Sequence, residues 1–180
     1  AYLGGGILAT GSECEILDME ADQLTTEGLI DHIEQNKPDL IGLTATTPIF
    51  HNTTVLAEKI KRNFPAIPLA LGGVHSTIVG KKALEECPHF DFQVQGEAEI
   101  TIQEIIVALE NRKSLEGIAG VNFRQGDTII ENPKRASIDN IDQIPIAARH
   151  LLGNNNYKSY LPNFGSTSYT GIFTSRGCPY

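Results

Sequence analysis

The chain has 180 residues, of which 41% are hydrophobic and 20% charged, with a formal net charge of −8. This balance excludes a disordered segment, because such segments lack apolar surface to bury. It also argues against a nucleic-acid binder, since no Lys/Arg stripe is available to displace phosphate counterions. No apolar run approaches the roughly 18–20 residues of a membrane span. Cys14, Cys87 and Cys178 stand at unrelated spacings and predict no disulfide framework, which favours the reducing cytoplasm.

Short apolar runs alternate with amphipathic stretches from residue 14 to residue 112. Strands are expected at 14–18, 40–44, 68–72 and 90–94, the last with the alternation of an edge or half-covered strand. Helices are expected around 29–33, ending before Lys37-Pro38, and at 52–63, 77–86 and 102–109. This rhythm predicts an α/β fold, a doubly wound, Rossmann- or flavodoxin-like sheet, mostly parallel, with helices on both faces.

The rhythm changes after Gly117. Two short apolar runs, 121–124 and 128–131, flank Gln125-Gly126-Asp127 and predict a β-hairpin. A connector of mixed composition follows. The run 170–174 is then expected to be the first strand of a further unit, so we interpret the chain as a fragment of a longer protein.

Ligands of open parallel sheets bind beyond the carboxyl ends of the strands. Three loops are expected at that edge: Thr44, Ala45, Thr46 and Thr47; Gly72, Gly73, Val74 and His75; and Gly96 with Glu97. Hydroxyl groups bind amide or phosphate groups of a long tail, and paired glycines allow a ligand to approach the backbone. Each loop also has a purely structural explanation, as a turn, a helix cap or a partner of a helix dipole. No dinucleotide-binding glycine motif, phosphate loop or nucleophile elbow occurs.

The end of the chain is more specific. Its last residues, Ser-Arg-Gly-Cys-Pro-Tyr at 175–180, closely resemble the opening of the C-x-x-x-C-x-x-C loop of radical S-adenosylmethionine (SAM) enzymes. The resemblance implies that Cys178 is the first of three cysteines that hold a [4Fe–4S] cluster, whose open iron chelates SAM. The other two would follow four and seven positions later, so this chain alone is expected to be neither cluster-binding nor catalytic.

With that ending, the preceding residues resemble the N-terminal cobalamin (B12)-binding domain of cobalamin-dependent radical SAM proteins, of the kind found in anaerobic magnesium-protoporphyrin IX monomethyl ester oxidative cyclases. The matching segments are 38–44, 72–77, 96–99 and 141–145. The resemblance implies that cobalamin is bound, that Thr44, Thr46, Gly72 and Gly73 accommodate its nucleotide tail, and that the partner is a radical SAM barrel of the same chain. The D-x-H-x-x-G motif that supplies a lower axial His elsewhere is absent.

The resemblance also divides the chain. It implies a cobalamin-binding domain over 1–116, a β-hairpin appendage over 117–135, a connector over 136–169 and the start of a truncated barrel over 170–180. Residues 1–11 align with the family's first helix, so the first strand and its ligand loop are expected to be missing. We therefore predict a weakened cobalamin site or a locally rebuilt sheet.

Other functions remain open at this point. A flavodoxin-like electron-transfer or small-molecule module is the main alternative, because its phosphate loop would follow the missing strand. A phosphorylated receiver is disfavoured, since threonines and Gly96-Glu97 stand where it needs an acidic acceptor and a Lys. A methylthio-transferring radical SAM enzyme is disfavoured too, because Cys14 and Cys87 are isolated.

Overall fold

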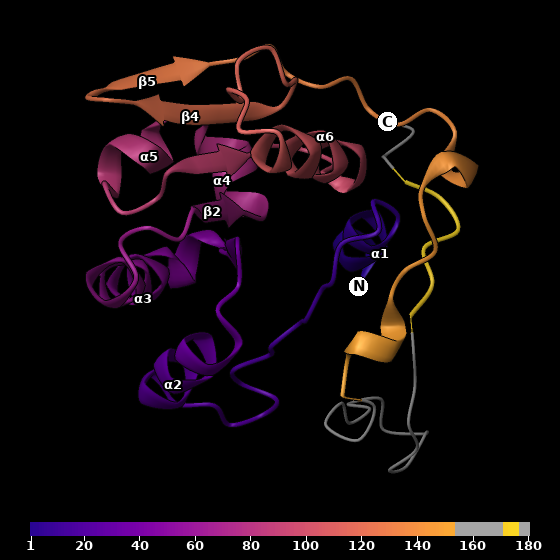
Figure 1. Cartoon of the computed structure of the whole chain (residues 1–180). Coiled ribbons are helices and arrows are strands. Elements are labelled where there is room, and N and C mark those ends of the chain that lie inside the picture. The colour runs from indigo at the N-terminus through magenta and orange to yellow at the C-terminus, as the bar shows by residue number, and fades with distance from the viewer. Residues whose placement is uncertain (154–170, 177–180) are drawn as a thin grey trace.

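A five-stranded sheet with the strand order β1-β2-β3-β4-β5 forms the centre of the computed structural model, which describes residues 1–153 and 171–176 (Figure 1). β1 (Ile41–Thr44), β2 (Leu69–Gly72) and β3 (Phe92–Val94) are parallel. β4 (Val121–Gln125) and β5 (Thr128–Glu131) form the predicted hairpin, which extends the sheet by pairing antiparallel with β3. The fold class is therefore the predicted α/β, mostly parallel one.

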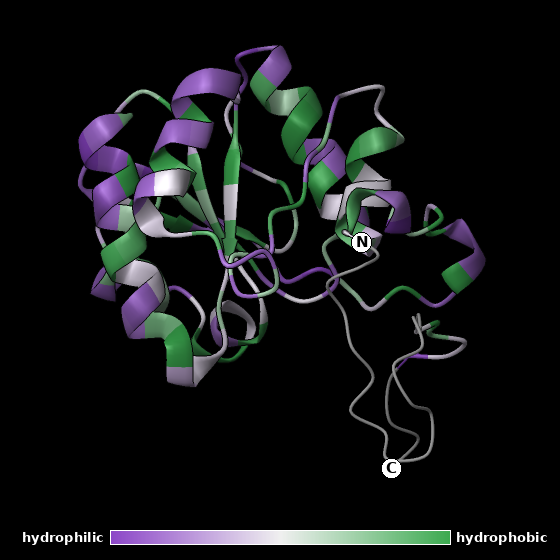
Figure 2. Ribbon diagram, turned by 90° about the horizontal axis from the view of Figure 1, so that it is seen from below, coloured by the Kyte–Doolittle hydropathy of each residue, from purple (hydrophilic) through white to green (hydrophobic). Residues whose placement is uncertain are grey.

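Helices cover both faces of this sheet. α2 (Thr26–Asn36), α3 (Phe50–Asn63) and α5 (Lys82–Glu86) share one apolar core with Leu69 and Leu71 of β2. α6 (Glu99–Glu110) builds a second core with Ala70, Phe92 and Val94. Alternate strand residues point to opposite faces, which is why neighbouring residues of β2 belong to different cores. Figure 2 shows the hydrophobic residues gathered on the strands.

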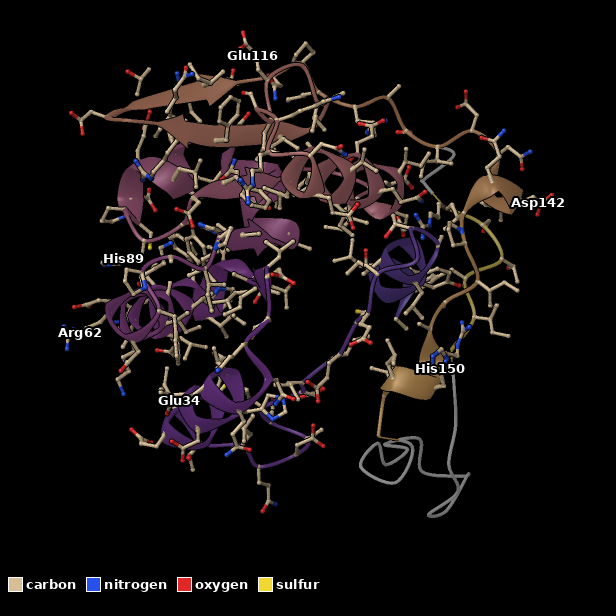
Figure 3. All side chains as sticks on the ribbon, in the orientation of Figure 1. Glu34, Arg62, His89, Glu116, Asp142 and His150 are labelled. Atoms are coloured by element: carbon tan, nitrogen blue, oxygen red, sulfur yellow. The ribbon has the colours of Figure 1, made fainter. Side chains whose placement is uncertain are left out.

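Residues next to α2 in the sequence determine where this helix begins and ends. The Thr25 hydroxyl accepts a 3.1 Å hydrogen bond from the backbone N–H of Gly28, which caps the helix. At the other end Lys37 adopts a left-handed conformation (φ 48°), so the helix stops before Pro38 as predicted. Polar side chains such as Glu34 of α2 and Arg62 of α3 point away from the sheet (Figure 3).

Two predictions for the middle of the chain are wrong. The helix expected over 77–86 is two short helices, α4 (Val74–Val79) and α5, because Gly80 between them adopts a positive φ of 68°. The strand expected to be an edge or half-covered one is β3, which lies between β2 and β4 with all three residues buried. Its alternation reflects Gln93, a polar residue that is nevertheless fully buried.

The strands predicted at 14–18 and 170–174 are also wrong within the described residues. Residues 14–18 belong to no strand and residues 171–174 form none either, while residue 170 lies outside the described part. A strand exists only where another one supplies hydrogen bonds, and neither segment has such a partner there. β1 is consequently an edge strand, and the sheet is not rebuilt by residues 14–18.

The glycine triplet of α1 (Tyr2–Leu8) has a packing role. All three glycines are buried, and α1 lies beside α6 and the connector (Figure 1). A Cβ on Gly6 would stand 2.7 Å from the carbonyl oxygen of Glu99, and one on Gly5 would overlap the carbonyl oxygen of Ile146. Short helical turns, η2 (Ile141–Gln143) and η3 (Arg149–Leu151), complete the connector.

Candidate functional site

The loops that follow β1 and β2 are in direct contact. The Ala45 N–H donates a 3.1 Å hydrogen bond to the carbonyl oxygen of Gly72, and the His75 N–H donates a 3.0 Å bond to the carbonyl oxygen of Ala45. Because β1, β2 and β3 are parallel, all three predicted loops leave the same edge of the sheet. We call these loops, 44–47, 72–77 and 95–97, the rim.

The glycines of the rim differ in whether protein atoms or open space lie where a Cβ would stand. Gly73 has a positive φ of 92°, and a Cβ there would lie 2.6 Å from the Thr44 hydroxyl and 2.7 Å from the carbonyl oxygen of Ala45. The neighbouring loop therefore occupies the space that a side chain at Gly73 would need. At Gly72 a Cβ would meet only the carbonyl oxygen of Leu43, at 3.9 Å, and at Gly96 it would meet nothing within 4 Å. Gly72 and Gly96 leave open space for a ligand.

Two hydroxyl residues join the second loop to the third, and the sequence analysis did not assign them a role. The Ser76 hydroxyl lies 3.0 Å from the carbonyl oxygen of Gly73 and 2.7 Å from that of Val94 at the end of β3. The Gly96 N–H donates a 3.0 Å bond to the Thr77 hydroxyl. Small hydroxyl residues in the first turn after a strand-ending loop are the sequence signal that points to such links.

His75 is held inside the rim. It is only 5% exposed, its ring stacks on Phe50 with a centroid separation of 3.9 Å, and its Nδ1 lies 3.2 Å from the Thr47 hydroxyl. Its Nε2 is buried and has no hydrogen-bond partner among the described residues. Buried polar atoms are nearly always paired, so this nitrogen is an exception within the described part of the chain.

Most of the remaining rim residues face outward. Thr44, Thr46, Thr47, Gly73 and Gly96 are exposed, in contrast to Ala45, which is buried. Val74 is 57% exposed despite its apolar side chain. An edge that combines hydroxyl groups, open backbone and an exposed apolar side chain suits a flat, largely apolar ligand with a polar tail.

Glu97 is the exception, because its carboxylate is engaged elsewhere. One oxygen accepts a 2.6 Å hydrogen bond from the Ile138 N–H of the connector, and the other lies 3.3 Å from Arg176 Nη1. Glu99, the next acid, lies 2.6 Å from Arg176 Nη2. Burial raises the pKa of Glu99, but the hydrogen bond and charge of Arg176, with backbone donors, outweigh it and lower the pKa overall.

The cysteines of the described residues show no sign of a metal site. Cys14 and Cys87 are free thiols, and burial raises the pKa of both, which disfavours the thiolate that a metal needs. Within 1–153 and 171–176 no three His, Cys, Asp or Glu side chains are grouped to hold a metal ion. The predicted cluster ligand Cys178 lies outside these residues.

None of the described helices has the length and apolarity needed to cross a bilayer.

Comparison with known proteins gives consistent matches. The sequence model of the B12-binding domain matches residues 1–106. An uncharacterized methyltransferase of Pyrococcus horikoshii is 33% identical over 180 residues, all of this chain but 38% of the relative. The anaerobic magnesium-protoporphyrin IX monomethyl ester cyclase of Synechocystis sp. is 30% identical over 183 residues, 99% of this chain and 35% of the relative. The chain thus spans less than two fifths of the length of these relatives.

A solved structure shares the fold. The radical S-adenosylmethionine methyltransferase TsrM from Kitasatospora setae, with cobalamin and a [4Fe–4S] cluster bound, superimposes with a TM-score of 0.66 at 19% sequence identity. The match covers 73% of this chain and 27% of the TsrM chain.

Proposed function

We propose that this chain, which belongs to the B12-binding domain family, holds the cobalamin of a radical SAM enzyme at the rim. The family match favours cobalamin over the flavodoxin-like alternative, and the chain is related to cobalamin-dependent radical SAM enzymes. The observation that carries the assignment to the rim is the set of linked loops at one edge of the sheet, with Gly72 and Gly96 open toward solvent.

The residues present fit such a cofactor. The unpartnered Nε2 of His75 offers a buried hydrogen-bonding position, and Thr44, Thr46 and Thr47 offer hydroxyl groups to the amides and phosphate of a nucleotide tail. Gly72 lets the tail approach the backbone. The link of Ser76 to β3 keeps the loops together and thereby preserves the shape of the rim.

When bound, cobalamin would supply methyl transfer or redox chemistry at its cobalt, and the protein's part is to bind, orient and shield it. The exposed Val74 would cover the cofactor's apolar surface, while the threonine hydroxyls and the Gly73 backbone would fix its tail. No D-x-H-x-x-G motif occurs, so this chain lacks the His that the motif supplies elsewhere.

The activity of the longer protein is inferred from its relatives. We infer a methyltransferase or oxidative cyclase whose barrel follows in the same chain, with Cys178 as the first cluster ligand and SAM as the second cofactor. This chain alone would bind cobalamin without turning over substrate. The unpaired thiols of Cys14 and Cys87 suit a reducing compartment, and we place the protein in the cytoplasm.

Titration of the chain with hydroxocobalamin, followed by visible absorbance, tests the proposal. We expect saturable binding that Gly72→Val abolishes, because its side chain would fill open space at the rim without meeting the protein. Thr128→Val on β5, an exposed position on the hairpin, is the control and should bind like wild type. Binding unchanged by Gly72→Val would contradict the assignment to the rim.

The open edge of β1 bears on the affinity. A strand that is paired on one side only, beside the first rim loop, supports weaker binding by this chain than by a version whose sheet continues past β1. Tight stoichiometric uptake of hydroxocobalamin by the 180-residue chain would refute that weakening.

A further inference from the structure

Arg176 lies two residues before Cys178 in the sequence. Its guanidinium group forms ion pairs with two carboxylates of one turn. Its Nη1 is 3.3 Å from Glu97 Oε1 and its Nη2 is 2.6 Å from Glu99 Oε1. The three side chains are 21%, 25% and 9% exposed, so the ion pairs are shielded from water on most sides. Partly buried, hydrogen-bonded ion pairs hold geometry better than surface pairs, which are screened and mobile.

Tyr2 of α1 holds the same segment from the other side. The Arg176 guanidinium carbon lies 5.2 Å from the centroid of the Tyr2 ring, within the range of a cation–π contact. The Phe173 N–H donates a 3.2 Å hydrogen bond to the Tyr2 hydroxyl, and the two rings are 5.9 Å apart. Residues 173 and 176 are therefore both fastened to α1, although 171 positions separate Phe173 from Tyr2.

The turn that binds Arg176 overlaps the third loop of the rim. Glu97 directly follows Gly96, whose N–H is bonded to Thr77 of the second loop. Its other carboxylate oxygen binds the Ile138 N–H, which joins the connector to the same turn. The second rim loop is thus linked to Arg176 through two adjacent residues, because Gly96 is hydrogen-bonded to Thr77 and Glu97 to Arg176.

Glu99 depends on Arg176 for its neutralisation. Glu99 is buried, and its second oxygen, Oε2, has no partner among the described residues. A helix dipole explains why an acid is favoured at the first turn of α6, but it does not explain why this carboxylate is turned toward a residue 77 positions away. Burial of a carboxylate without a cationic partner is costly, so the buried Glu99 needs the charge of Arg176.

We propose that Arg176 is a positioning residue that holds the segment leading to Cys178 against Glu97 of the rim and Glu99 at the start of α6. In this way the described segment that leads toward Cys178 is held against the edge that we propose for cobalamin. The proposal rests on the proposed function for its consequence, while the fastening itself is a property of the chain.

Hydrogen–deuterium exchange of the 180-residue chain tests the fastening. Arg176→Met keeps the length of the side chain and removes its charge, and it should speed exchange at 171–176 and at Ile138 by roughly tenfold, as expected for a lost charged hydrogen bond. Arg176→Lys should restore part of the protection, because an ammonium group can pair with only one of the carboxylates at a time. The matched control is Arg62→Met, which removes an exposed ion pair with Glu58 within α3 and should leave 171–176 unchanged.

The consequence is tested in the longer protein loaded with cobalamin and its iron–sulfur cluster. The dipolar interaction between cob(II)alamin and the reduced cluster, measured by electron paramagnetic resonance, reports their separation without any turnover. Arg176→Met should keep cobalamin and iron content and broaden the distribution of separations. Wild-type distances in Arg176→Met, or exchange at 171–176 within about twofold of wild type, would overturn the role of Arg176. Failure of the wild-type protein to take up cobalamin would overturn the proposed function, and with it the positioning consequence.

Discussion

The hydroxyl of Ser76 lies 2.7 Å from the carbonyl oxygen of Val94, which ties the first turn of α4 to the carboxyl end of β3. Ser76 is fully buried, so water cannot replace this bond if it is lost. This buried hydroxyl therefore helps to keep the second loop of the rim beside the end of β3, together with the bond between Thr77 and Gly96.

Replacing this hydroxyl should weaken both the fold and the rim. Ser76→Ala leaves the Val94 carbonyl without its partner, and we expect a loss of about 1–3 kcal/mol in the free energy of unfolding, measured by urea denaturation. Thr54→Ala is the control, since the exposed Thr54 hydroxyl bonds only the carbonyl oxygen of His51 in its own helix. A Ser76→Ala chain as stable as Thr54→Ala would show that the bond does not matter.

The closeness of the first two rim loops should make Gly73 intolerant of a side chain. Gly73→Ala forces a Cβ against Thr44 and Ala45 at a positive φ, and we expect a destabilisation of about 1–3 kcal/mol, with weaker hydroxocobalamin binding. Gly42→Ala on β1 serves for comparison, because a Cβ there meets nothing within 4 Å, and its stability should stay within about 0.5 kcal/mol of wild type. Equal denaturation midpoints for the two variants would contradict the packing described here.

The glycines of α1 give a third prediction. Gly6→Ala places a methyl group against the backbone of Glu99 and should destabilise the chain by about 1–3 kcal/mol, because α1 must move away from α6. Gly28→Ala in α2 is the matched helical change, where a Cβ would meet only the flexible end of Leu24 and the Thr25 hydroxyl. It should stabilise by up to about 1 kcal/mol through its effect on the unfolded chain. Thermal or urea unfolding distinguishes these opposite signs.

Glu99 predicts how stability responds to acid. The pKa of Glu99 is lower in the folded chain than its ordinary value of 4.5. The ionised carboxylate therefore stabilises the fold at every pH above about 4.5. This contribution disappears as the pH falls through the lower, folded-state pKa. Arg176→Met should therefore be less stable than wild type at neutral pH, by about 1.5–3 kcal/mol, the worth of a charged hydrogen bond.

The same difference should shrink on acidification. Denaturation curves of wild type and Arg176→Met, recorded at successive pH values below neutral, should converge once Glu99 is protonated. A gap that stays constant down to the acid end of the series would mean that Glu99 is not the titrating partner.

Much of the fold was predictable because periodicity and turn chemistry decide it. The end of α2 before Pro38, the strands β1 and β2 and the hairpin around Gly126 all follow from residues adjacent in the sequence. The break at Gly80 was missed, because an isolated glycine within an amphipathic stretch does not reveal its φ. Residues 14–18 form a short apolar run like those of strands, but pairing with another strand is a long-range property that a local run cannot reveal.

In the candidate site too, local sequence predicts some features, while others depend on contacts between residues far apart in the chain. The three loops could be placed at one edge from strand direction alone, but the destination of the Glu97 side chain could not, because its partners are 41 and 79 residues away in the chain. A further feature of Gly73 could not be predicted either. The space beside its Cα is filled by Thr44 and Ala45 of the neighbouring loop, which the register of β1 against β2 brings there.

The position of β1 at the margin of the sheet has a consequence for handling the chain. One side of Ile41–Thr44 pairs with no strand of the part of the chain that the structure describes, and Ile41 and Leu43 are only half covered. Such a margin is a template for strand addition between molecules. We therefore expect concentrated samples to self-associate along this strand, and a Lys in place of Gly42 to keep them monodisperse in light scattering.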